Sequence, residues 1–203
     1  MKLNILWYSA IALLLVSCQP KTEVVETTNE FGRKIRYERR KSDFAKEGKY
    51  QRFFEDGTVA EEAMYLNDSL DGVRRFYYPG GKVEMEQGYN HGIDHGPYKK
   101  YYESGGLEIT YNFVNGAIEG ESIRYYPNGK VMEVVTIVHN EENGPFKEYY
   151  DTGVIKAEGG YIYEEDEALE NGELREYDST GVLIRIANCE KGVCRTKWKI
   201  NGQ

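Results

Sequence analysis

A glycine recurs every 24 residues along most of this chain. Each copy that it begins carries the same residue types at the same distances, so the spacing marks an internal repeat. Units this short cannot bury a core alone, and they stack so that each contacts only its neighbours. One longer step, of 28 residues, precedes the last copy. The copies begin at Gly48, Gly72, Gly96, Gly120, Gly144 and Gly172.

Several other positions are shared by the copies; we count them from the first glycine, which is position zero. Every copy has glycine at position nine, an aromatic residue at position five and a branched aliphatic residue at position eleven. The aromatic content of 13% argues against a disordered chain. Position six is aromatic in five copies, at Phe54, Tyr78, Tyr102, Tyr126 and Tyr150. Position seventeen holds Tyr65, Tyr89, Phe113, Ile137, Tyr161 and Cys189.

Each copy has the pattern of a β-hairpin. In the segment from Tyr126 to Lys130 (YPNGK), proline suits the start of a type I turn and glycine suits the left-handed residue that follows it. A second turn closes the copy, as at Asn115-Gly116. Two strands and two turns use all 24 residues and leave no room for a crossover helix, so neighbouring strands must be antiparallel. The sequence therefore predicts an all-β fold, an elongated single-layer antiparallel meander of stacked β-hairpin repeats.

The turn type also predicts the register within each hairpin. A three-residue loop pairs position six with position ten and position five with position eleven. Simple alternation along a strand then places position seventeen on the same side as position five, and we expect this side to be buried. Position six is expected on the opposite, more polar side.

The repeats define the boundaries of the other segments. We expect a signal peptide over residues 1–17, a lipidated cysteine and flexible tether over 18–30, and a capping half-repeat over 31–47. Six repeats would span residues 48–198, and a short tail 199–203. The residues from Glu164 to Asn171 (EEDEALEN) supply the longer step and are predicted to be an acidic loop insertion.

The first 18 residues have the character of an export signal. Lys2 precedes an apolar run from Ile5 to Val16, which is too short for the ~20 residues of a transmembrane helix but fits a signal peptide. Leu15-Val16-Ser17-Cys18 resembles the lipobox of bacterial lipoproteins. This resemblance implies cleavage before Cys18 and acylation of that residue, which would anchor the protein in a membrane of the cell envelope, facing the periplasm or the surface.

The pattern G-x-x-x-x-Y-Y-x-x-G-x-[VIL] resembles the MORN repeat in its bacterial variant, over roughly residues 45–198. Many bacterial proteins with this variant are lipoproteins and are labelled YwqK-type antitoxins. The resemblance implies an interaction module rather than an enzyme. An exported, lipidated protein is poorly placed to neutralise a cytoplasmic toxin, so an antitoxin-like or immunity-like role would mean masking a secreted effector.

The sequence contains two clusters of potentially reactive side chains. Cys189 and Cys194 are separated by four residues, and an oxidising compartment favours a disulfide between them over a redox or metal-binding pair. His91 and His95 lie in a glycine-rich turn with no third convergent ligand, so we predict solvated histidines and no metal site. On the last strand, alternating cations such as Arg195 and Lys197 discourage edge pairing, or they form a basic docking patch.

Enzyme and nucleic-acid functions find no support in the sequence. It contains no G-x-S-x-G, P-loop or H-E-x-x-H motif, so we predict no catalytic residues and no cofactor. The formal net charge of −8 argues against nucleic-acid binding. The aromatic row at position six either packs the sheet or binds a partner, and both remain open. The leading hypothesis is a non-enzymatic, lipid-anchored envelope protein whose tyrosine-rich surface binds a protein or glycan. The alternatives are an antitoxin-like or immunity-like protein that masks an effector, and a structural spacer.

Overall fold

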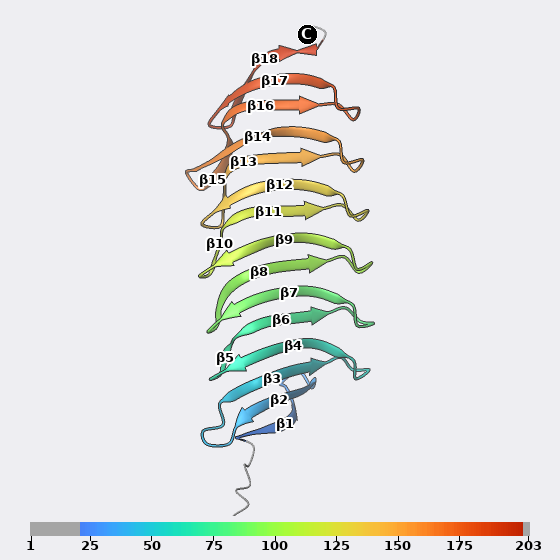
Figure 1. Cartoon of the computed structure of the whole chain (residues 1–203), viewed down its shortest axis with the longest axis vertical. Coiled ribbons are helices and arrows are strands. Elements are labelled where there is room, and N and C mark those ends of the chain that lie inside the picture. The colour runs from blue at the N-terminus through green and yellow to red at the C-terminus, as the bar shows by residue number, and fades with distance from the viewer. Residues whose placement is uncertain (1–20, 201–203) are drawn as a thin grey trace, which may run out of the picture.

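The computed structural model describes residues 21–200, and these form one antiparallel sheet whose strands stack along the long axis of the molecule (Figure 1). This confirms the predicted all-β meander. The signal peptide predicted for residues 1–17, and Cys18, lie outside the described residues. Within residues 21–200 no helix has the length and apolar character needed to cross a bilayer. The strands are β1 (Thr22–Thr28), β2 (Lys34–Arg40), β3 (Lys46–Phe53), β4 (Val59–Leu66), β5 (Ser69–Leu70), β6 (Gly72–Tyr77), β7 (Val83–Asn90), β8 (Ile93–Tyr101), β9 (Leu107–Val114), β10 (Ala117–Ile118), β11 (Gly120–Tyr125), β12 (Val131–Val138), β13 (Glu141–Tyr149), β14 (Ile155–Glu164), β15 (Glu167–Glu170), β16 (Gly172–Tyr177), β17 (Leu183–Glu190) and β18 (Val193–Lys199).

The hairpin turn of each copy follows from its glycine at position nine. In the third copy, the Tyr102 amide donates to the Gly106 carbonyl and the Gly105 amide donates to the Tyr102 carbonyl, both at 2.8 Å. Gly105 adopts a φ of 102°, which a residue with a side chain rarely accepts. Tyr101 pairs with Leu107, so the predicted pairing of position five with position eleven is confirmed.

A β-bulge beside each of these turns changes which side chains are buried. The register shifts between positions four and five in all six copies, as at Arg52 and Phe53. One extra residue on the second strand reverses the alternation beyond it. Position seventeen therefore faces away from positions five and eleven. The prediction that positions five and seventeen share one buried side is wrong.

Two faces can now be defined. The core face carries positions two, four, six, thirteen, fifteen and seventeen, and the outer face carries positions three, five, eleven and fourteen. One buried cluster lies on the core face of the fourth to sixth copies: Val135, Ile137, Phe146, Ala157, Leu174, Ala187 and Cys189. Aromatic pairs extend this core, with ring centroids 4.5 Å apart for Tyr98–Tyr111 and for Phe146–Tyr161. Burial raises the pKa of Tyr111 and of Tyr161 to about 12.

In every copy except the fifth, the second turn ties the copy to the one before it. Both residues of this turn have positive φ, as at His91 and Gly92, which is typical of two-residue hairpins. The Gly92 amide donates to the Leu70 carbonyl at 2.7 Å, and the Gly116 amide donates to Asp94 in the same way at 2.8 Å. These turns therefore form a second column of contacts along one edge of the stack.

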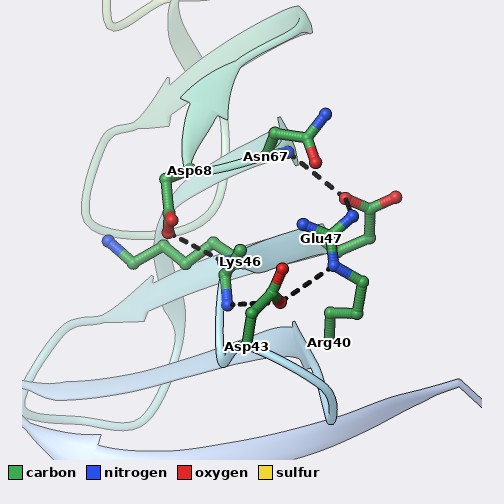
Figure 2. A network of polar contacts seen from close by, with 7 residues as sticks. Arg40, Asp43, Lys46, Glu47, Asn67 and Asp68 are labelled. Carbon is green, nitrogen blue, oxygen red and sulfur yellow. Dashed lines mark hydrogen bonds and ion pairs between the residues drawn. The ribbon is translucent and has the colours of Figure 1, made fainter.

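The same column reaches the first repeat, and Figure 2 shows this contact. Asp68 Oδ1 accepts a hydrogen bond from the Lys46 amide at 2.8 Å. The backbone amide of Asn67 donates a hydrogen bond to Glu47 Oε2 at 3.2 Å, and Arg40 Nη1 lies 3.9 Å from the same carboxylate oxygen. The loop between β2 and β3 is thus tied to the turn after β4.

A complete hairpin precedes the first glycine-marked copy. Strand β1 pairs along its whole length with β2, and its turn repeats the usual bonds: the Asn29 amide donates to Arg33 and the Gly32 amide donates to Asn29, both at 2.9 Å. The flexible tether predicted for residues 18–30 is therefore wrong over Thr22–Thr28. The half-repeat predicted for residues 31–47 is the second half of this hairpin.

The acidic insertion also differs from expectation. The segment from Glu164 to Asn171 was predicted to be a loop, but β14 extends to Glu164 and pairs with β15. Only Glu165 and Asp166 form the turn, with φ of 53° and 64°. The extra residues lengthen one hairpin because paired backbone satisfies its hydrogen bonds, which an open loop would leave to solvent.

The close approach of two strands at Gly88 gives a stability prediction. A Cβ atom at this position would lie 2.2 Å from the backbone oxygen of His95, too close for any contact. We expect Gly88→Ala to lower the free energy of unfolding by about 2–3 kcal/mol, as overpacking does. Gly106→Ala is the matched control, since its Cβ would meet no atom within 4 Å. Urea denaturation of both variants would measure the difference, and equal midpoints would contradict the structure.

Candidate binding surface

The position-six aromatic residues join one repeat to the next. The Tyr102 hydroxyl donates to the Tyr125 carbonyl at 2.6 Å, and each tyrosine at this position makes the corresponding bond to position five of the following copy. The other hydroxyl-to-carbonyl distances are 2.8 Å from Tyr78 to Tyr101, 2.7 Å from Tyr126 to Tyr149, and 2.9 Å from Tyr150 to Tyr177. Phe54 occupies the same place without a hydroxyl. All five rings are half-buried.

The terminal hairpins replace this aromatic residue by a short polar one. Asp178 Oδ1 accepts hydrogen bonds from the amides of Thr180 and Val182, at 2.9 and 3.0 Å. In the first hairpin, Asn29 Oδ1 likewise accepts hydrogen bonds from the backbone amides of Phe31 and Arg33. The substitution of Asp178 was visible in the sequence. It fits the position of the sixth copy, since within residues 21–200 no further hairpin follows for an aromatic residue to bind.

The position-six bonds give a second stability prediction. Tyr102→Phe keeps the ring but leaves the Tyr125 carbonyl without its donor, so we expect a loss of about 1 kcal/mol. The triple variant with Tyr78→Phe and Tyr126→Phe should lose about 3 kcal/mol, because the sites are separate. Tyr125→Phe is the control, since its hydroxyl has no hydrogen-bond partner within residues 21–200. Thermal unfolding measures the losses. If Tyr125→Phe lowers the melting temperature as much as the triple variant does, the hydrogen bonds assigned to the position-six hydroxyls are refuted.

On the outer face, three of the five tyrosines at position five, Tyr77, Tyr101 and Tyr177, bind carboxylates instead. The Tyr77 hydroxyl donates to Glu62 at 3.0 Å, and Tyr177 donates to Glu158 at 2.8 Å. The Lys49 ammonium lies 2.8 Å from Glu62 and is the main reason why the pKa of this carboxyl is lowered. The hydrogen bond to Glu158 raises the pKa of Tyr177. The outer face is therefore a network of fixed polar pairs.

A hollow of about 320 Å³ opens on the core face between the fifth and sixth copies. Its walls are apolar and aromatic, from Phe146, Tyr150, Tyr161 and Leu174. Charged side chains line it as well, including Lys156, which pairs with Glu148 at 2.7 Å. A second hollow of about 230 Å³, which includes Tyr126 and Glu133, lies one repeat away. Burial, followed by the nearby carboxylates Glu142 and Glu148, raises the pKa of Glu133 against the effect of Arg124.

The remaining candidate residues lie apart from these hollows. Cys189 and Cys194 are opposite one another in β17 and β18 and are joined by a disulfide, with their Cα atoms 3.9 Å apart. His91 and His95 are exposed, and His91 Nδ1 lies 2.6 Å from Asn90 Oδ1. The described part of the chain contains no group of three or more His, Cys, Asp or Glu side chains that could hold a metal ion.

Sequence reasoning missed one charged cluster on the core face. Glu61 is 4% exposed and lies between two guanidinium groups, with Arg52 Nε and Arg74 Nη2 at 2.8 and 2.7 Å from its two carboxylate oxygens. The Lys46 ammonium lies 5.0 Å from the ring centroid of Tyr65 and near two further tyrosines. The signal was present as charges at positions two, four and thirteen, but the wrong parity placed positions two and four on the solvent side, away from position thirteen.

The stacked hairpins define a β-hairpin repeat protein. A family model described as the MORN repeat variant matches it at residues 46–67, 70–91, 94–115, 118–139 and 142–163, which is more than half of the chain. The chain belongs to the MORN repeat variant family. The hairpin of β16 and β17 continues the same register beyond the matched residues, with Tyr177 opposite Leu183.

Other comparisons add little. Among solved structures, a porin-like protein from Bacteroides uniformis ATCC 8492 is 8% identical, with 86% of this chain and 92% of that chain covered and a TM-score of 0.22. No curated protein matches the chain.

Proposed function

We propose that the protein is a non-enzymatic, lipid-anchored repeat protein of the bacterial cell envelope that binds a protein or glycan on the core face of its sheet. The observation that carries the proposal is the row of tyrosines at position six. Their hydroxyl groups are fixed by the next repeat, so the rings are held in place before any partner arrives. A rigid aromatic row loses little conformational entropy on binding.

The composition of the hollows supports this role. Aromatic walls with charged groups at their edges match the make-up of protein interfaces, in which tyrosine is enriched. Ring faces also pack against the apolar faces of sugars or peptide side chains. The hollow beside Tyr150 combines both features with Lys156 and Glu176. On the outer face, in contrast, the position-five hydroxyls of Tyr77, Tyr101 and Tyr177 are already paired with carboxylates.

A photo-crosslinking amino acid placed at position twelve tests the binding surface. Met132 and Ile184 line the two hollows and tolerate a larger apolar group without loss of a hydrogen bond. We expect adducts in intact cells from both sites and none from the matched outer-face position Ile123. Adducts that form only from Ile123 would overturn the choice of face. A secreted effector in the adduct would identify the masking role, and a glycan or envelope protein the adaptor role.

The lipid anchor is tested separately. Cys18→Ser removes the thiol that acylation requires, so the protein should move from the membrane fraction to the soluble fraction of the cells. Cys189→Ser serves as the control, because it removes a cysteine without touching the predicted lipidation site. Continued membrane retention of the Cys18→Ser protein would contradict the anchor.

A structural spacer is the second candidate. The tyrosine hydroxyl bonds run along one edge of the stack from the second to the sixth copy, and turn-to-turn bonds run along the other edge, as a stiff rod requires. If no adduct forms at Met132 or Ile184, shortening the chain by one repeat distinguishes the roles. A spacer tolerates loss of the position-six rings but not a change of length.

A further inference from the structure

Within residues 21–200 the sheet has two open edges, because its first and last strands each pair on one side only. Strand β1 pairs with β2 alone and β18 pairs with β17 alone. Figure 1 shows the two strands at opposite ends of the stack. The outward backbone groups of an edge strand can pair with another chain, and proteins usually block such edges with charges, proline or bulges. An edge without these features is therefore a candidate interface.

Strand β18 carries features that block pairing. Arg195, Lys197 and Lys199 occupy every second residue, and the register between β17 and β18 shifts once, which marks a bulge. If two β18 strands paired about Thr196, Arg195 would lie opposite Lys197 of the second copy. A pairing about either neighbouring residue would place two identical cations opposite one another. Like charges in opposite positions are destabilising, so this edge is poorly suited to self-association.

Strand β1 has none of these features. Its seven residues (TEVVETT) include no lysine, arginine or proline, and five of them are β-branched, which favours an extended strand. The strand pairs with β2 along its whole length without a register shift. Val24 is 52% exposed on it. A regular, unblocked edge of this length is suited to pairing with a further strand.

The bonds to β2 determine which backbone groups of β1 are free. The Lys41 amide donates to the Lys21 carbonyl at 3.0 Å, and the Asn29 amide donates to the Arg33 carbonyl at 2.9 Å. Bonding alternates along an antiparallel pair, so the odd-numbered residues between Lys21 and Asn29 also bond to β2. The even-numbered residues direct their N–H and C=O groups away from the sheet. These residues are Thr22, Val24, Glu26 and Thr28.

The free groups of β1 match those of a second copy. When two β1 strands pair antiparallel about Val25, each even-numbered residue lies opposite another even-numbered residue. Such a pair exchanges both of its N–H···O bonds, so every outward group of the strand is satisfied. No carboxylate lies directly opposite another carboxylate. The opposed residues, from one strand to the other, are Thr22 with Thr28, Glu23 with Thr27, Val24 with Glu26, and Val25 with itself.

Head-to-tail stacking of β1 on β18 is disfavoured by strand direction. Fourteen successive antiparallel pairings connect these two strands, so they run in the same direction. Placing the first strand of one copy against the last strand of another would create a parallel pair in an antiparallel sheet. Parallel pairing is slightly less stable per residue. A two-fold axis at Val25 instead continues the antiparallel order.

We propose that two copies of this chain associate through their β1 strands about a two-fold axis at Val25. Directly opposite residues share one face of a sheet, so the core faces of both copies lie on the same side. The dimer then presents two rows of position-six aromatic side chains in one continuous sheet. A partner with repeated binding sites engages both rows, which raises its avidity without a new kind of contact. The dimer forms whether or not Cys18 is acylated, and whichever partner binds.

Disulfide crosslinking tests the register. The probe is the chain from residue 18 with Cys18→Ser, whose two other cysteines are joined to each other. With Val25→Cys, the two new thiols lie opposite one another in a non-hydrogen-bonded pair, where Cα atoms are about 4.5 Å apart and within reach of a disulfide. We expect a disulfide-linked dimer under mild oxidation. Val24→Cys is the matched control, because Val24 lies opposite Glu26 and its two thiols are too far apart to join.

Sedimentation equilibrium measures the dimer itself. The unlinked probe should follow a monomer–dimer equilibrium. Val24→Pro removes an N–H that faces away from β2, so the sheet is retained but each half of the dimer loses a hydrogen bond. We expect the dissociation constant of the dimer to rise by about 30-fold, because each bond contributes about fivefold. Thr196→Pro makes the same kind of change on β18 and should leave the dissociation constant unchanged.

Several results would overturn the dimer. One is a monomer mass at every concentration, and another is assemblies that keep growing with concentration, as head-to-tail stacking produces. Equal crosslinking of Val24→Cys and Val25→Cys, or equal weakening by Thr196→Pro, would also contradict it. Circular dichroism checks that each variant keeps its sheet. A monomeric probe alongside adducts from Met132 and Ile184 in cells would refute the dimer and leave the proposed binding surface intact.

Discussion

Phe146→Ala should lower the free energy of unfolding by about 3–5 kcal/mol, the range for a large side chain removed from a core. Phe146 is 4% exposed on the core face of β13, and its ring stacks on Tyr161 with centroids 4.5 Å apart. The single sheet has no second layer that could move in to fill the space. Urea denaturation followed by circular dichroism would measure the loss.

Phe31→Ala is the matched control for that experiment. Its ring is 78% exposed, so its removal should change the free energy of unfolding by less than about 0.5 kcal/mol. A loss at Phe31 equal to the loss at Phe146 would mean that the buried cluster is not the main core.

Glu61→Gln is the second change with a large expected effect. The substitution keeps the shape but leaves Arg52 and Arg74 without their shared carboxylate in a largely buried place. Removing one partner of a buried ion pair costs about 3–5 kcal/mol, and partial exposure of Arg74 places this case near the lower limit. The loss would be measured as a decrease in the urea midpoint.

Glu62→Gln supplies the comparison one residue away. Glu62 faces the other side of the sheet and pairs with the half-exposed Lys49, so its loss should cost about 1 kcal/mol or less. A larger loss for Glu62→Gln than for Glu61→Gln would place the buried charges on the outer face, contrary to the observed register.

Much of the fold could be predicted from residue spacing. The 24-residue period, the glycine at position nine and the absence of room for a helix led to a meander of antiparallel hairpins, with Tyr101 opposite Leu107 as expected. The first hairpin escaped notice because Glu23 stands where the other copies have glycine, and Thr28 and Asn29 replace the two aromatic residues. Backbone pairing does not need those side chains, so β1 forms without the signature.

The candidate surface was only partly predictable. The aromatic row at position six was identified, but its partners, such as the Tyr125 carbonyl for Tyr102, lie 23 residues away and depend on how far the next repeat advances. The Glu61 cluster was missed for the same reason, since Arg74 comes from the following copy. Contacts between repeats are set by stacking geometry, which residue types within one copy do not encode.

The sequence by itself determined the repeat, the turn chemistry and the antiparallel pairing, because each depends on residues close together along the chain. Only the tertiary structure decided which face is buried. One extra residue beside each turn reverses the alternation of side chains, and a bulge of this kind has no residue signature that distinguishes it from an unbroken strand. That reversal brings positions thirteen to seventeen, including Glu61, onto the same side as Phe146 and the position-six tyrosines, and this is the face where we propose that a partner binds.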